Sequence, residues 1–240
     1  MSARKALPPR LNEGNKSASR TLDALIFDLD GTLVDTFPLI IASLQHACEV
    51  ATGRRHSEAE VVTMFGPTEQ DILHTAVGPV RYSVAEHAYY DYYERHHAQY
   101  VSVYEGIVRL LDQALHHGYR LALFTGKNHR SAWFTIRATG LEKYFPVVIT
   151  GDDIEFNKPH PQGIWLALRE LGVEAKRAAY VGDMPADIEA GHAAGVRTAG
   201  ALWHSRFRDE VIACKPDYLF DTVAAMGNWL DGAYLRPLLE

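Results

Sequence analysis

The chain has 240 residues, of which 47% are hydrophobic and 22% are charged, and both values are ordinary for a globular protein. This composition excludes a wholly disordered chain, a collagen-like repeat and a disulfide-dense scaffold. No apolar run approaches the roughly 18 residues that would span a bilayer, so a membrane protein is not expected. The length fits one domain with an insertion or two small domains.

The net charge of −6 is unevenly distributed along the sequence. The first 22 residues carry five Lys/Arg and one Glu, which leaves 19 basic and 29 acidic residues on the rest of the chain. Because the chain after residue 22 is this acidic, nucleic-acid binding, which needs a basic surface, is not expected. The acidic chain is compatible with a small phosphorylated metabolite, provided that a metal and one or two cations are placed locally.

The N-terminal segment and the two cysteines indicate where in the cell the protein is expected. Residues 1–21 have no apolar core of a secretory signal, and we expect a disordered leader or tag-like extension rather than an organelle transit peptide. Cys48 and Cys214 match no metal-binding or redox spacing, which favours a reduced, cytoplasmic location. The sequence leaves open whether the protein is a monomer or a homodimer.

Short apolar runs, each closed by a polar residue or glycine, recur along the chain. Continuous runs without alternation are typical of strands that are buried on both faces of a parallel sheet. The runs are Ala24–Phe27, Leu121–Phe124, Val147–Ile149, Ala178–Val181, Val196–Ala199 and Tyr218–Phe220.

Segments with helical periodicity separate these runs, notably 106–118, 162–171 and 185–194. Strands that alternate with helices predict an α/β fold, a doubly wound, Rossmann-like parallel sheet. In such sheets ligands bind beyond the carboxyl ends of the strands. The residues that close the apolar runs are therefore expected to line one crevice.

One stretch breaks this alternation. From Phe37 to about Tyr104 there is helical periodicity and no strand-like run, with Pro38 suited to a first helical turn. We expect a small helical cap over residues 37–104, inserted after the first strand, and a catalytic core formed by 22–36 and 105–240. A tyrosine-rich stripe with helical spacing, from Tyr89 to Tyr100, is expected to form the core of the cap.

Carboxylates follow two of the predicted strands. Asp28 and Asp30 would point to the same side of an extended strand end, roughly 7 Å apart. Asp183 closes another run, and Asp187 lies one helical turn later. Carboxylates that converge from two strands would repel one another without a cation, and oxygen ligands suit Mg²⁺.

Two further groups complement these carboxylates. Thr125 offers a hydroxyl at the end of its strand, and Gly126 is expected to leave the following backbone N–H groups open to an anion. Lys158 precedes a proline, which favours an extended conformation that can project its side chain inward. Carboxylates, a metal, a hydroxyl and a lysine together are what phosphoryl transfer needs.

Four motifs in order, LIFDLDGTLVDT, LFTGK, NKPHP and VGDMPADIEAG, resemble those of the haloacid dehalogenase superfamily, in its phosphoglycolate phosphatase-like branch. By this resemblance Asp28 is the nucleophile that forms an aspartyl phosphate, and Asp30 is the general acid and base. Thr125 and Lys158 hold the phosphate, and Lys127 occupies a position where this branch often has lysine. Asp183, Asp28 and the backbone carbonyl of Asp30 ligate Mg²⁺, supported by Asp187.

The sequence does not identify the substrate or decide which cap residues contact it. Segment 65–69 resembles the loop that touches substrate in this branch, which would place Thr68 and Glu69 in the binding site. It is equally compatible with a simple helix start. Arg54, Arg55, Glu69 and Gln70 are spare polar groups that could recognise different leaving groups. The resemblance implies a Mg²⁺-dependent phosphatase of a small phosphomonoester, with a sugar-phosphate mutase of the same superfamily as an alternative. A phosphoaspartate-accepting signalling module, which also gathers carboxylates, threonine and lysine on a parallel sheet, is an alternative from a different class.

Overall fold

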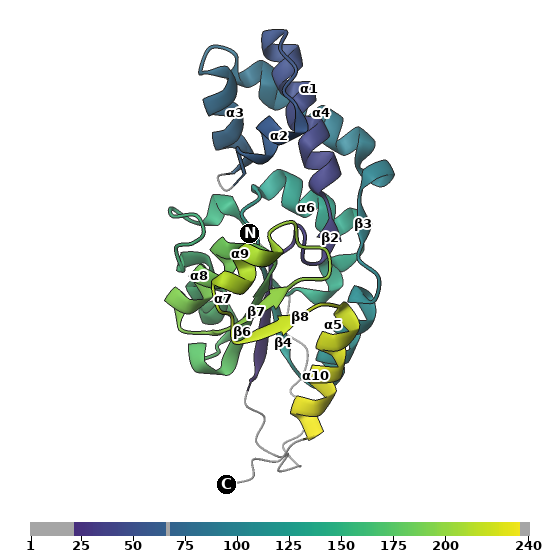
Figure 1. Cartoon of the computed structure of the whole chain (residues 1–240), viewed down its shortest axis with the longest axis vertical. Helices are drawn as coiled ribbons and strands as arrows, with labels where there is room; N and C mark the ends of the chain where they lie inside the picture. The colour runs from purple at the N-terminus through teal and green to yellow at the C-terminus, as the bar shows by residue number, and fades with distance from the viewer. Residues whose placement is uncertain (1–21, 66–67, 236–240) are drawn as a thin grey trace, which may run out of the picture.

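The computed structural model describes residues 22–65 and 68–235. A six-stranded sheet lies at the centre, and all of its strand pairs are parallel. Figure 1 shows this sheet below a separate group of helices. In spatial order the strands are β5 (Val147–Ile149), β4 (Arg120–Phe124), β1 (Ala24–Phe27), β6 (Ala178–Gly182), β7 (Arg197–Ala201) and β8 (Tyr218–Phe220).

Strand β1 illustrates why the apolar runs form central strands. Leu25 and Phe27 pack on one face of the sheet, and Ala24 and Ile26 pack on the other, all fully buried. The first face is covered by α5 (Ile107–His116), α6 (His129–Ala138) and α10 (Val223–Leu235), and the second by α7 (Gln162–Leu171) and α8 (Pro185–Ala194). The predicted doubly wound α/β fold is confirmed.

Short elements complete the core. Helix α9 (Arg208–Ala213) packs its Val211 against Ile188 and Leu202. Three single 3₁₀ turns are η1 (Leu141–Tyr144), η2 (Gly151–Asp153) and η3 (Ala175–Arg177).

A two-stranded ribbon marks the point where the chain leaves the core and returns. Strand β2 (Val34–Asp35) pairs antiparallel with β3 (Ser102–Val103). The sequence predicted no strand between Phe37 and about Tyr104, and β3 departs from that expectation. Two residues are too short a run to give a periodic signal, since a strand is normally recognised over four or more residues.

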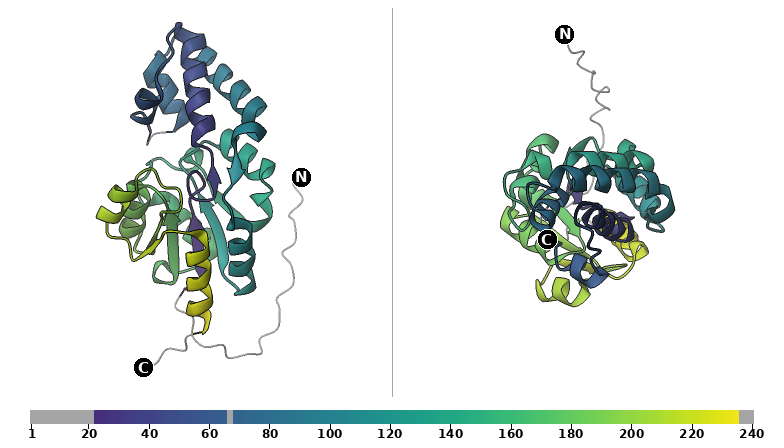
Figure 2. Two further views of the ribbon diagram at one scale, coloured as in Figure 1. Left: turned by 45° about the vertical axis from the view of Figure 1, so that its right-hand side comes forward. Right: turned by 90° about the horizontal axis from the view of Figure 1, so that it is seen from above.

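Four helices between β2 and β3 form the cap. They are α1 (Phe37–Thr52), α2 (Glu58–Val62), α3 (Glu69–Val77) and α4 (Tyr82–Tyr100). The two views of Figure 2 show α1 and α4 side by side, with the cap standing over the end of the sheet from which β1 exits. No helix in the described part of the chain is long and apolar enough to cross a membrane.

The tyrosine stripe contributes to the core of the cap. Tyr89 and Tyr93 are fully buried, with ring centroids 5.8 Å apart. Tyr92 and Tyr100 are only half-buried at the edge of the same cluster. Tyr93 also reaches beyond the cap, because its hydroxyl lies 2.7 Å from Oγ1 of Thr135 on core helix α6.

Candidate active site

The candidate site forms where three adjacent strands end. Strands β4, β1 and β6 are neighbours in the sheet, and the residues that follow them are Thr125, Asp28 and Asp183. All three side chains are buried. The order of the strands therefore brings together residues that lie up to 155 positions apart in the sequence.

The turn after β1 fixes the position of the first motif. The backbone N–H of Asp28 continues the sheet by donating to the carbonyl of Val181 (2.8 Å). The chain then folds back, and Leu33 and Val34 both donate to the carbonyl of Leu29. This tight turn leaves the Asp30 side chain beside the cavity that Asp28 faces.

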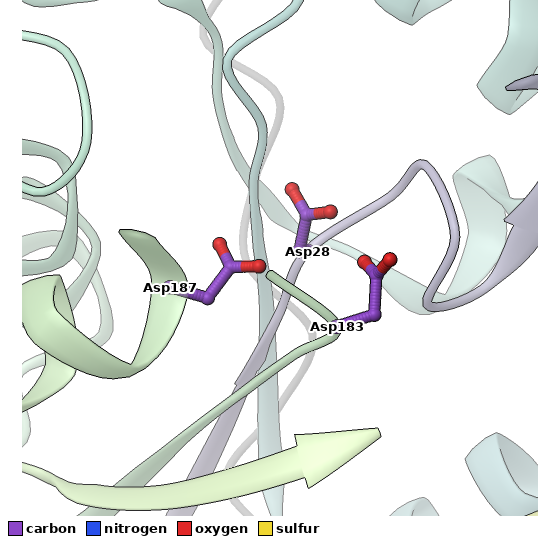
Figure 3. Close-up of side chains that lie close together, drawn as sticks. All are labelled: Asp28, Asp183 and Asp187. Carbon is purple, nitrogen blue, oxygen red and sulfur yellow. The ribbon is translucent and has the colours of Figure 1, made fainter. Parts of the chain in front are cut away.

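Three carboxylates, those of Asp28, Asp183 and Asp187, point toward a common centre in Figure 3. One oxygen of each lies within 4.8 Å of the others. Lys158, in the loop before α7, donates from Nζ to Oδ1 of Asp28 (2.7 Å) and to Oδ1 of Asp187 (2.8 Å). A single ammonium group thus faces three buried carboxylates, and this imbalance favours a bound cation.

Asp187 is already well supplied with protein donors. Besides Lys158, the hydroxyl of Tyr180 donates to its Oδ1 (3.1 Å), and the backbone N–H of Met184 donates to its Oδ2 (3.0 Å). Both oxygens of Asp187 are therefore occupied by protein donors, whereas Asp183 keeps one oxygen without a donor among the described residues. The supporting role that the sequence suggested for Asp187 stays a prediction.

Asp183 offers the freest ligand atom. Thr32 donates to its Oδ1 (3.1 Å), whereas no group among the described residues makes a hydrogen bond to the buried Oδ2. Burial, reinforced by the nearby Asp187 and Asp28 carboxylates, raises the pKa of Asp183 well above its usual range. A buried carboxylate oxygen without a donor, next to two more carboxylates, fits a hard divalent cation such as Mg²⁺.

Asp30 stands apart from this carboxylate cluster. Its Oδ1 accepts a short hydrogen bond from Thr36 and lies 3.5 Å from Nζ of Lys127. Burial raises the pKa of Asp30, against the opposing effect of Lys127. A carboxyl group with a raised pKa that borders the cavity is suited to donate and accept a proton. Ligation of a metal by its backbone carbonyl stays a prediction.

Asp28 has a shifted pKa as well. Burial raises the pKa of Asp28 to about 7, although the contact with Lys158 lowers it. A cation among the carboxylates would favour the ionised form. The ionised form is the one that can act as a nucleophile.

Lys127 and Glu69 link the core to the cap. Nζ of Lys127 lies 3.2 Å from Oε1 of Glu69, the first residue of α3. Glu69 also accepts hydrogen bonds from Oγ of Ser131 (2.7 Å) and from the backbone N–H of Asn128 (3.1 Å). Burial alone would lower the pKa of Lys127, but Asp30, Tyr93 and Glu69 together raise it well above its usual range.

The second motif differs in detail from the expectation. Thr125 and Gly126 line the cavity as predicted. However, the backbone N–H of Lys127 donates to Oγ1 of Thr125 (3.2 Å), and that of Asn128 donates to Glu69. The expectation that the N–H groups after Gly126 stay open to an anion is therefore wrong for these two, because local side chains already accept from them.

The cap residues divide between the cavity and the surface. Glu69 borders the cavity, whereas Thr68 caps α3 by accepting from the backbone N–H of Asp71 (3.2 Å). Thr68 thus follows the helix-start interpretation. Gly66 and Pro67 of the same segment lie outside the described residues.

The spare polar groups expected on the cap do not reach the cavity. Arg54 pairs with Glu60 (2.6 Å), and Arg55 pairs with Glu49 (2.9 Å), on exposed surface. Gln70 is not among the residues that line the cavity. The expectation that these groups recognise the leaving group is wrong for Arg54 and Arg55, whose partners lie on exposed surface, and it has no support for Gln70, which does not line the cavity.

The cavity itself measures about 130 Å³. Its polar floor comes from the four motifs, and its roof comes from the cap. Phe65, in the segment 65–69 that the sequence singled out, borders the cavity. Sequence reasoning missed the other apolar members of the lining, which are Phe37, Ile40, Ile72, Met184 and Ala186. It also missed Asn128 and Ser131. Asn128 is the N-cap of α6, and an asparagine at this position is a signal for a helix start that the sequence contains.

Comparison with known sequences settles the family. Residues 25–201 match the family of haloacid dehalogenase-like hydrolases. The chain belongs to this family. It is therefore an enzyme of the hydrolase class, as the four motifs predicted.

Individual relatives agree with this assignment. Pyrophosphatase PpaX of Bacillus pumilus is 33% identical over 211 residues, which cover 86% of this chain and 97% of that protein. A predicted phosphoglycolate phosphatase from Haemophilus somnus shares the fold with a TM-score of 0.80 at 24% identity, covering 87% of this chain and 98% of that one. CbbY from Rhodobacter sphaeroides, solved in complex with phosphate, has a TM-score of 0.76 at 24% identity. The match covers 88% of this chain and 99% of that one.

Proposed function

We propose that this hydrolase is a Mg²⁺-dependent phosphatase that releases phosphate from a small phosphomonoester through an aspartyl-phosphate intermediate. The proposal rests on one observation: carboxylate oxygens of Asp28, Asp183 and Asp187 lie within 4.8 Å of one another. Two of these residues, Asp28 and Asp187, are bound to Lys158 and line the cavity. The names of its relatives, a pyrophosphatase and a phosphoglycolate phosphatase, point to the same class of chemistry.

Each residue has a role that follows from its contacts. Asp28 is the nucleophile, and Lys158 holds its Oδ1 in place. Asp30 is the general acid, because its raised pKa keeps a proton available beside the cavity. Thr125 and Lys158 would hold the phosphoryl group. Mg²⁺, held by Asp28 and Asp183 with Asp187 in support, would neutralise charge on the phosphoryl oxygens.

The reaction then takes two steps. A carboxylate oxygen of Asp28 attacks phosphorus, the bond from phosphorus to the ester oxygen breaks, and Asp30 gives its proton to the departing alcohol. Water next attacks the phosphoryl group while Asp30 takes up one of its protons. The bond from phosphorus to Asp28 breaks, and inorganic phosphate leaves with the enzyme restored.

A sugar-phosphate mutase is the nearest alternative. Such an enzyme must hold a second phosphate away from the nucleophile, and this normally takes a cation. The described cap residues that line the cavity are Phe37, Ile40, Phe65, Glu69 and Ile72, which include no Lys or Arg. This lining favours the hydrolase. The signalling-module alternative loses its support because the chain belongs to a hydrolase family.

The cellular setting remains a proposal. Cys48 and Cys214 are unpaired cysteines, which is compatible with a reduced cytoplasmic compartment.

Phosphate release from a panel of substrates tests the proposed function. The purified full chain would be assayed with Mg²⁺ and with EDTA against phosphoglycolate, pyrophosphate, sugar phosphates, nucleotides and short alkyl phosphates. We expect Mg²⁺-dependent release that Asp28→Asn abolishes. Metal-independent release, or release that survives in Asp28→Asn, would contradict the proposal.

A further inference from the structure

Much of the cavity lining beyond the carboxylates and lysines is apolar. Phe37, Ile40, Phe65 and Ile72 contribute from the cap, and Met184 and Ala186 contribute from the core. Within this lining the rings of Phe37 and Phe65 stack with centroids 5.6 Å apart. An apolar wall gains free energy when it covers carbon, and it costs free energy when it removes water from a charge.

The cations of the cavity are already neutralised. Among the described lining residues only Lys127 and Lys158 are basic. Lys158 is bound to Asp28 and Asp187. Lys127 lies on the leaving-group side, next to the proposed acid Asp30, and it is paired there with Glu69.

Glu69 is held firmly in this position. Its side chain is about 6% exposed, and hydrogen bonds from Ser131 and from the N–H of Asn128 fix both of its oxygens. These contacts, together with Lys127, outweigh burial and keep the pKa of Glu69 below its usual value. The cap thus supplies a fixed negative charge that cancels the charge of Lys127, the described lining cation beside the proposed acid Asp30.

The cavity is also small. Its volume of about 130 Å³ is less than half of the roughly 300 Å³ at which pockets for drug-sized ligands begin. The phosphoryl group must occupy part of this space. The cavity is open on one side, and the enclosed space that remains fits a leaving group of only a few heavy atoms.

We propose that the substrate is the phosphate monoester of a short, uncharged alcohol, and that Glu69 sets this preference by neutralising Lys127. The inference rests on the proposed phosphatase function and narrows its substrate class. It separates this chain from the substrates in the names of its relatives, since glycolate and phosphate are both anionic leaving groups. Glu69 acts through Lys127 and is a specificity-determining residue rather than a catalytic one.

Two nearly isosteric substrates test the preference directly. Phosphoglycolate and 2-hydroxyethyl phosphate have similar size, but only the first carries a carboxylate on its leaving group. For the Mg²⁺-loaded wild-type chain we expect kcat/KM to be higher for 2-hydroxyethyl phosphate by about tenfold or more. An equal or reversed ranking would overturn the inference while leaving the phosphatase function standing. No release from any ester in the panel would overturn both.

Glu69→Gln tests the cause of the preference. The amide oxygen can still accept from Ser131 or Asn128, but the negative charge beside Lys127 is gone. We expect the ratio of kcat/KM for phosphoglycolate to that for 2-hydroxyethyl phosphate to rise by about tenfold. The matched control is Glu94→Gln, which removes a cap carboxylate that pairs with Arg130 away from the cavity, and which should leave the ratio unchanged.

The two variants together give a clear decision. A ratio that stays constant in Glu69→Gln, or that shifts equally in Glu94→Gln, would show that Glu69 does not set the specificity. Because the wild-type ranking is measured independently, loss of folding in Glu69→Gln would still leave the substrate preference open to refutation.

Discussion

Gly31 and Asp183 approach each other so closely that a Cβ atom on Gly31 would lie 2.3 Å from Oδ2 of Asp183. Gly31 also has a φ of +80°, in the left-handed region that favours glycine. The turn after β1 therefore passes close to the Asp183 carboxylate, and only a glycine at position 31 leaves room for it. The two motifs are joined by steric contact as well as by chemistry.

We expect Gly31→Ala to reduce both stability and metal binding. The backbone strain costs about 1–3 kcal/mol, and the added methyl group must displace the Asp183 carboxylate. Chemical denaturation and Mg²⁺ titration calorimetry measure the two effects. Gly53→Ala is the matched control, because Gly53 has a φ of +75° with open space around it. It should lose stability through strain alone and bind Mg²⁺ normally, and equal Mg²⁺ affinity in both variants would refute the steric link.

Asp28→Asn should abolish turnover without destabilising the metal-free protein. Burial raises the pKa of Asp28 to about 7, so above that pH the folded protein bears the cost of a buried charge that the amide avoids. We expect kcat to fall at least about 10³-fold. In EDTA at pH 8 the Tm of the variant should equal or exceed that of the wild type. Mg²⁺ should raise the wild-type Tm more than that of the variant, and an equal rise would exclude Asp28 as a ligand.

Asp30→Asn should impair turnover according to the leaving group. A general acid typically contributes about 10²–10⁴-fold, and it matters most when the departing oxygen is strongly basic. We therefore expect a large loss of kcat with an alkyl phosphate and a much smaller loss with 4-nitrophenyl phosphate. Equal losses with both substrates would argue against proton donation by Asp30.

The core of the fold could be predicted because its signals are local. Strands β1, β5 and β8 have the predicted bounds, since each is an apolar run that ends at a turn. Strand β7 begins at Arg197, one residue later than expected, and extends to Ala201. Its final alanine and glycine residues carry too little apolar character to mark where a strand ends.

The candidate catalytic residues could be located for a related reason. Asp28, Thr125 and Asp183 each follow a strand directly, so the topology of a parallel sheet places them together. Glu69 was found only as a possible substrate contact. Its true partners, Lys127 and Ser131, lie 58 and 62 residues away, and they depend on how the cap packs on α6. Neither periodicity nor a local motif encodes that docking.

Thr135 anchors the cap on the core, and its hydroxyl should contribute measurably to stability. Oγ1 of Thr135 lies 2.7 Å from the hydroxyl of Tyr93 and 3.0 Å from Nε2 of His97, and all three residues are buried. Thr135→Val leaves these partners unsatisfied, and we expect a loss of about 1–3 kcal/mol in the free energy of unfolding. Thr135→Ser keeps the hydroxyl and should lose distinctly less in urea denaturation, whereas equal losses would assign the effect to packing.

His97 should make the protein less stable in mild acid. Burial, with a smaller effect from Lys127, lowers the pKa of His97 from 6.5 to about 4. Between these values the unfolded chain binds a proton that the folded protein excludes, so stability is lost as the pH falls from about 6.5 toward 4. The full effect of this one group is at most about 3 kcal/mol. Denaturation of wild type and His97→Gln at a series of pH values measures it. The difference in unfolding free energy between the two should change in favour of the variant as the pH falls across this window, and a constant difference would show that His97 is not the group responsible.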